Sequence, residues 1–140
     1  MRKYFLLFVL LFCAVITVSA DDEKFYKALQ TCSPYSDGGQ VSTEGMNVSF
    51  KNEIVGKSGD KCVYKEYVDF AGINSCTTCR LSKKQIDELV NVMRAYSTVQ
   101  KYSGEKVDIS KLSNVQNNPV VNVWNKYLQD SSVCTLEYNK

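Results

Sequence analysis

The sequence contains no histidine among its 140 residues. This absence excludes Ser-His-Asp and Cys-His activation of a nucleophile, because both need an imidazole as general base. It also excludes every metal site with a histidine ligand. A zinc site would need cysteine thiolates alone, and the C-x-x-C pair at Cys76 and Cys79 has no matching second pair. We therefore expect no metal and no other cofactor.

Clusters of lysine and arginine are also missing, and the formal net charge is only +2. Arg2 and Lys3 supply that excess, since without them the count of Lys and Arg falls from 17 to 15 and equals the 15 Asp and Glu. A nucleic-acid binder needs a basic patch, and a segment that binds anionic lipid needs a run of basic residues. We expect neither kind of partner.

The first twenty residues have the pattern of a cleaved signal peptide. Arg2 and Lys3 precede an apolar run from Phe5 to Val18, and small residues end the segment at Ala20. The run is too short to span a bilayer comfortably, which disfavours the alternative of an uncleaved anchor. We expect residues 1–20 to be removed, and residues 21–140 to form one small exported domain, periplasmic or extracellular, with no transmembrane segment.

Five cysteines remain after removal of the signal, at positions 32, 62, 76, 79 and 134. Export permits disulfides. Because the number is odd, at most two bridges form within the chain and one thiol is left over.

The hydrophobic pattern predicts an α+β domain with an N-terminal helix, a three-stranded antiparallel meander, two more helices and room for a short C-terminal edge strand. Ser82 and Gln85 form a capping box at the start of the second helix. The segments that the pattern predicts are a helix at 21–32, a loop at 34–45, strands at 46–54, 62–70 and 76–81, a helix from 82 to 103, a helical turn at 110–115, a helix at 119–129 and a strand at 133–138. For the first hairpin, apolar alternation favours a register that places Ile54 opposite Cys62, Val48 opposite Val68 and Met46 opposite Phe70.

The Cys76 and Cys79 pair does not have the setting of a thioredoxin-like redox centre. The helix cap at Ser82 comes after both thiols, so neither gains the helix dipole that stabilises a thiolate. In an extended strand the two side chains point to opposite faces, with Cα atoms about 10 Å apart, whereas a disulfide needs roughly 4.4 to 6.8 Å. We expect one of the two to be structural and the other spare.

The strand register directs Cys62 to a partner outside its own hairpin, either Cys32 or Cys134. One of Cys76 and Cys79 would then form a disulfide with whichever of Cys32 and Cys134 is left. A thiol-disulfide protein that uses Cys76 and Cys79 is kept as an alternative.

One local feature resembles a known family. A helix followed by a meander with Glu53-Ile54-Val55-Gly56 before a hairpin turn is similar to the cystatins, protease inhibitors whose first hairpin carries Q-x-V-x-G. The window Asn52–Gly56 has neither the glutamine nor the spacing, and the later helices are foreign to that fold, so no functional residue is carried over.

No catalytic motif is present, and we expect a non-enzymatic binding module whose partner is an unidentified protein or small ligand. The predicted contact surface is the loop with Tyr35, Asp37, Gly38 and Gly39, together with the adjoining sheet edge. The alternative is a histidine-free hydrolase that uses two carboxylates. Its candidates are Asp37, Glu44, Glu66 and Asp69.

The triplet Asn47-Val48-Ser49 is a glycosylation sequon if the source is eukaryotic. Otherwise it is polar alternation on an exposed strand face.

Overall fold

The computed structural model describes residues 22–43, 46–103 and 119–139. The predicted signal segment and the predicted helical turn at 110–115 lie outside these residues. The described elements are, in chain order, α2 (Asp22–Thr31), β1 (Tyr35–Thr43), β2 (Met46–Ser58), β3 (Lys61–Phe70), β4 (Ile73–Leu81), α3 (Lys83–Ser103), α4 (Pro119–Leu128) and β5 (Cys134–Asn139).

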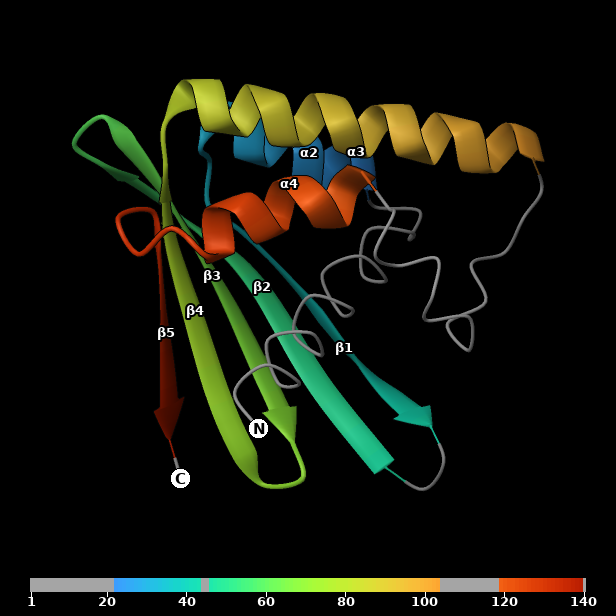
Figure 1. The fold of residues 1–140 in the computed structure, drawn as a ribbon, viewed down its shortest axis with the longest axis vertical. Helices are drawn as coiled ribbons and strands as arrows, with labels where there is room; N and C mark the ends of the chain where they lie inside the picture. Colours follow the sequence, from blue (N-terminus) through green and yellow to red (C-terminus); the bar gives the residue numbers. More distant parts are fainter. Residues whose placement is uncertain (1–21, 44–45, 104–118, 140) are drawn as a thin grey trace.

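The five strands form one antiparallel sheet in the order β1-β2-β3-β4-β5, and the three helices gather at one end of it (Figure 1). The predicted fold is therefore wrong in its strand count and its order. The sheet is larger than a three-stranded meander, because four strands and not three follow the first helix. The last strand lies at the sheet edge, as expected for the C-terminal segment.

The prediction of a loop at residues 34–45 is wrong for most of that segment. Residues Tyr35 to Thr43 form β1, and they pair with β2 without a break in register from Tyr35↔Ile54 to Thr43↔Met46. Ser36, Asp37, Gly38 and Gly39 are turn formers, but pairing along a complete strand outweighs their local preference.

The register of the hairpin between β2 and β3 differs from the prediction by two residues. Val48 pairs with Phe70, Phe50 with Val68 and Ile54 with Tyr64. A shift by two keeps every side chain on its predicted face, because the side-chain period of a strand is two. The turn between β2 and β3 also comes later in the chain than predicted. The first strand of the hairpin does not end at Ile54 but continues to Ser58, past a register irregularity between Ile54 and Gly56. Gly56 has a φ of 128°, which favours glycine at this point.

The first helix ends in a Schellman motif. Cys32 adopts a positive φ of 51°, its N–H donates to the Leu29 carbonyl at 3.2 Å, and the Ser33 N–H donates to the Ala28 carbonyl at 2.9 Å. Glycine usually occupies this position. Here the cysteine is tied to β3 through a disulfide to Cys62, with a Cα–Cα distance of 5.7 Å.

The start of α3 matches the predicted capping box. The Gln85 N–H donates to the Ser82 hydroxyl at 3.3 Å, and the Ser82 N–H donates to the Gln85 side-chain oxygen at 2.8 Å. The helix then buries an apolar stripe made of Ile86, Leu89, Val90 and Met93.

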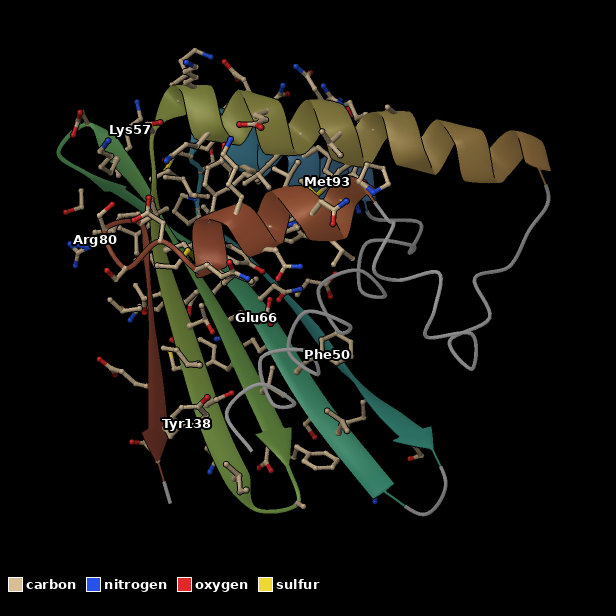
Figure 2. The ribbon with its side chains drawn as sticks, in the orientation of Figure 1. Phe50, Lys57, Glu66, Arg80, Met93 and Tyr138 are labelled. Carbon is tan, nitrogen blue, oxygen red and sulfur yellow. A yellow bond between two sulfur atoms is a disulfide. The ribbon has the colours of Figure 1, made fainter. Side chains whose placement is uncertain are left out.

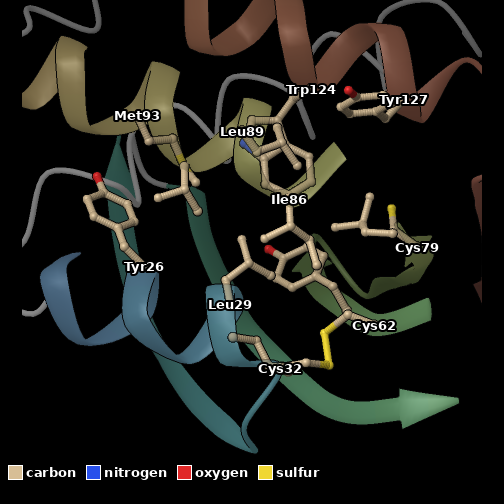
Figure 3. Packing of buried hydrophobic residues seen from close by; sticks show 14 of the residues in the cluster. Tyr26, Leu29, Cys32, Cys62, Cys79, Ile86, Leu89, Met93, Trp124 and Tyr127 are labelled. Carbon is tan, nitrogen blue, oxygen red and sulfur yellow. A yellow bond between two sulfur atoms is a disulfide. The ribbon is translucent and has the colours of Figure 1, made fainter. Parts of the chain in front are cut away.

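The main core lies between the three helices and one face of the sheet (Figure 3). Leu29 from α2, Leu89 from α3 and Trp124 from α4 meet Tyr64 and Leu81 from the sheet, and all five are at most 4% exposed. We call this helix-bearing surface the inner face. A second, smaller cluster lies on the same face beyond the helices, where Val48 and Val68 are buried beside Phe50 and Phe70.

Candidate functional site

A row of polar side chains crosses the inner face between the two apolar clusters. Asp37, Asn52, Glu66 and Thr77 are successive partners across β1, β2, β3 and β4. Asn52, Glu66 and Thr77 are all buried. The single proton of the Tyr64 hydroxyl has two acceptors within reach, Asn52 Oδ1 at 3.1 Å and Glu66 Oε2 at 3.3 Å. The Tyr64 hydroxyl thus offers a partner to one oxygen of each of two buried side chains, Asn52 and Glu66. Figure 2 shows Glu66 at mid-sheet, with Phe50 and Tyr138 in the part that extends past α4.

The carboxylates proposed for a hydrolase do not converge. Asp37 and Glu66 share the inner face but have Asn52 between them, which places their strands about 10 Å apart. Asp69 lies on the opposite face, because it pairs with Ser49 and Asn74. Glu44 lies outside the described residues.

The predicted binding residues Tyr35, Asp37, Gly38 and Gly39 are in β1 and not in a loop. Tyr35 packs on the core, with its ring centroid 5.9 Å from that of Phe25. The edge of β2 that was predicted to receive a partner segment is already paired with β1. Among the described strands the sheet edges are β1 and β5. A role for these four residues in binding stays a prediction.

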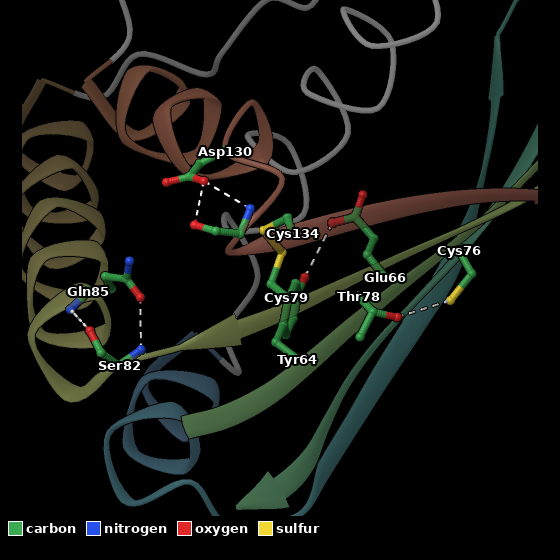
Figure 4. Close-up of a disulfide and its surroundings, with 10 residues drawn as sticks. Tyr64, Glu66, Cys76, Thr78, Cys79, Ser82, Gln85, Asp130 and Cys134 are labelled. Carbon is green, nitrogen blue, oxygen red and sulfur yellow. Dashed lines mark hydrogen bonds between the residues drawn. A yellow bond between two sulfur atoms is a disulfide. The ribbon is translucent and has the colours of Figure 1, made fainter. Parts of the chain in front are cut away.

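The cysteines of the C-x-x-C pair have different environments. Cys79 is fully buried and forms a disulfide with Cys134, its direct neighbour on β5, at a Cα–Cα distance of 4.1 Å. Cys76 is a free thiol of intermediate exposure, and its Sγ lies 3.9 Å from the Thr78 hydroxyl (Figure 4). The two sulfur atoms therefore do not form the dithiol pair that a thioredoxin-like reaction uses. The remaining disulfide joins Cys32 to Cys62, outside the hairpin of Cys62.

The sheet face opposite the helices carries an open candidate site. We call this the outer face, and its hollow, of about 380 Å³, the outer-face groove. Strands β2, β3, β4 and the end of β5 supply its lining, which comprises Ser49, Phe50, Lys51, Tyr67, Val68, Asp69, Asn74, Ser75, Cys76 and Asn139. The described helices pack on the other face, so none of them covers the groove.

Tyr67 is central to the groove because it pairs with Lys51 on one side and Cys76 on the other. Its hydroxyl donates to Glu53 Oε2 at 3.4 Å, and the Lys51 ammonium lies 5.5 Å from the ring centroid. Lys51 is also 3.6 Å from the Glu53 carboxylate. Burial, with the neighbouring Cys76 and Glu53, raises the pKa of Tyr67, so the phenol stays protonated at neutral pH.

The groove thus combines an aromatic ring, one cation, one anion and several neutral hydrogen-bonding groups. Sequence reasoning missed it, although one signal was present. Tyr67 lies between Lys65 and Asp69 on the polar side of its strand, and an aromatic side chain on such a face is a common mark of a contact surface.

Comparisons with protein-family models, with curated proteins and with solved structures found no match for this chain. No helix in the described part of the chain is long and apolar enough to cross a membrane.

Proposed function

We propose that the protein is an exported, disulfide-stabilised binding domain that uses no catalytic chemistry and contacts its partner in the outer-face groove. The observation that carries this proposal is the hollow of about 380 Å³ on the sheet face away from the described helices. Ligand sites are typically concave, with a few polar groups that fix orientation. The two disulfides are compatible with export.

The charges of the groove support binding of a ligand that is polar and close to neutral. Lys51 and Asp69 carry opposite charges, and Ser49, Asn74 and Asn139 offer neutral donors and acceptors. Tyr67 adds apolar area with a hydroxyl at its tip, a combination enriched in binding surfaces.

The test is capture of partners from the native compartment by the wild type and by two variants of the outer face. The groove variant carries Lys51→Ala and Asp69→Ala. The matched control carries Arg80→Ala and Glu137→Ala, which remove one exposed cation and one exposed anion of the outer face outside the groove lining. We expect the control to retain a partner that the groove variant loses.

A third variant, Tyr35→Ala with Asp37→Ala, tests the surface predicted from the sequence. Loss of the partner with this variant, together with full retention by the groove variant, would move the binding site to β1 and reject the groove. Thermal unfolding of each variant shows whether a loss of binding reflects loss of the fold.

A further inference from the structure

The triplet Asn47-Val48-Ser49 is the single N-x-Ser/Thr triplet in the 140 residues. Its middle residue is not proline, as the acceptor pattern requires. A triplet of this kind is common by chance, so the surroundings of Asn47 decide whether its side chain can act as an acceptor.

Asn47 is exposed and is the second residue of β2, close to the hairpin end that joins β1 and β2. Val48 next to it is fully buried on the inner face. Because alternate side chains of a strand point to opposite faces, Asn47 and Ser49 both belong to the outer face. The pair Thr43 and Met46 lies at the end of the sheet away from the helices (Figure 1).

The Asn47 side chain makes a hydrogen bond that uses its oxygen. The Ser42 hydroxyl, opposite on β1, donates to Asn47 Oδ1 at 2.5 Å. An N-linked glycan attaches through the amide nitrogen Nδ2, so this bond does not occupy the reacting atom.

We propose that Asn47 is a modification site that carries one N-linked oligosaccharide when the chain passes through a eukaryotic secretory pathway. The donor is an oligosaccharide on a polyprenyl diphosphate. Asn47 Nδ2 forms a bond to the anomeric carbon of the first sugar, the bond from that carbon to the diphosphate oxygen breaks, and the amide loses one proton to the transferase. The polyprenyl diphosphate leaves with the bonding electrons, and no group is oxidised or reduced.

The attached glycan would stand at the margin of the outer-face groove, because Ser49 of the same triplet belongs to its lining. It would not disturb the main core, whose residues are on the inner face. This inference does not depend on the groove binding a partner.

The experiment is secretion of the full chain from cultured eukaryotic cells, followed by intact-mass measurement before and after peptide N-glycosidase. We expect a single glycan mass that the enzyme removes, with a deamidation mark at Asn47. Asn47→Gln and Ser49→Ala should each abolish the glycan. Asn74→Gln, at an exposed asparagine of the same face outside any such triplet, should retain it.

A second version of the protein has residues 1–20 replaced by a signal peptide that is known to work in the same cells. This version enters the secretory pathway even if residues 1–20 do not direct the chain there. Secreted protein of unmodified mass in that form, or a glycan that persists in Asn47→Gln, would overturn the proposal. Loss of the glycan in Asn74→Gln would overturn it equally.

Discussion

Gly38 and Gly39 lie side by side in β1, yet the space for a side chain differs between them. A Cβ on Gly38 would come within 2.6 Å of the Phe50 carbonyl oxygen, whereas a Cβ on Gly39 would lie 3.1 Å from the end of the Phe50 ring. A backbone carbonyl in a paired strand has little freedom to move, while a ring on a half-buried side chain can tilt. The glycines therefore permit close packing inside the sheet.

We predict that Gly38→Ala destabilises the protein by about 1 to 3 kcal/mol, as expected for overpacking. Gly39→Ala should cost clearly less, since only the Phe50 ring must shift. Urea unfolding of both variants measures the difference. Equal losses would mean that β1 does not lie against β2 as described.

At the residue scale, alternation along β4 was predictable from the sequence. Alternation places the side chains of Cys76 and Cys79 on opposite faces of the sheet, so that one cysteine is structural and the other is spare. Which of the two joins a disulfide was not predictable, because that depends on whether β5 lies beside β4, and the sequence pattern does not specify this neighbour.

Tyr127 and Glu88 link α4 to α3, and both have shifted pKa values. The Tyr127 hydroxyl donates to Glu88 Oε2, and Lys126 Nζ lies 3.2 Å from Glu88 Oε1. Burial, then the bond to Glu88, raises the pKa of Tyr127 from 10.0 to about 12. The bond from Tyr127, then the one from Lys126, lowers the pKa of Glu88.

We predict that Tyr127→Phe lowers the free energy of unfolding at neutral pH and that this loss shrinks at both pH extremes. Above about pH 10 the phenol of the unfolded chain ionises first, so the contribution of Tyr127 fades as pH rises toward about 12. The contribution of Glu88 is present above its usual pKa and fades as pH falls through the lowered value. Denaturant unfolding of the two proteins across pH tests this, and a constant difference at all pH values would contradict it.

At the element scale, helices with strong end signals were predictable and the first strand was not. Ser82 and Gln85 define the start of α3 through contacts within four residues of each other. The pairing of β1 with β2 has no comparable local signal, since Gly38 and Gly39 favour a turn and no apolar alternation marks residues 35–40. The register error has the same origin, because a shift by two residues leaves the apolar pattern unchanged.

The turn between β3 and β4 contains a residue in an unfavourable conformation. Ala71 has a φ of 51° and Gly72 a φ of 78°. A left-handed conformation costs alanine roughly 1 to 2 kcal/mol.

We predict that Ala71→Gly stabilises the protein by about 0.5 to 1 kcal/mol, after allowance for the larger entropy of glycine in the unfolded chain. Gly72→Ala should destabilise it by the same argument. Thermal unfolding of the two variants measures both effects. Destabilisation by Ala71→Gly would show that residue 71 does not have the left-handed conformation described here.

At the scale of the whole molecule, one face of the sheet packs on the core and the other face carries the groove. The helices, both disulfides and the main apolar cluster belong to the inner face, where Cys62 and Cys79 lie. The outer face holds the groove and the free thiol of Cys76. The candidate site could not be predicted from the sequence, because its lining comes from four strands whose register is set by tertiary pairing.

Cys79 faces the core and Cys76 faces the groove, and the cysteine linkages report on both positions. Peptide mapping of the oxidised protein, after alkylation of free thiols without reduction, identifies every linkage. We predict that Cys32 is linked to Cys62, that Cys79 is linked to Cys134, and that Cys76 carries the alkyl group. A disulfide between Cys76 and any of the other four would contradict the assignment of the two faces, and with it the outer-face groove.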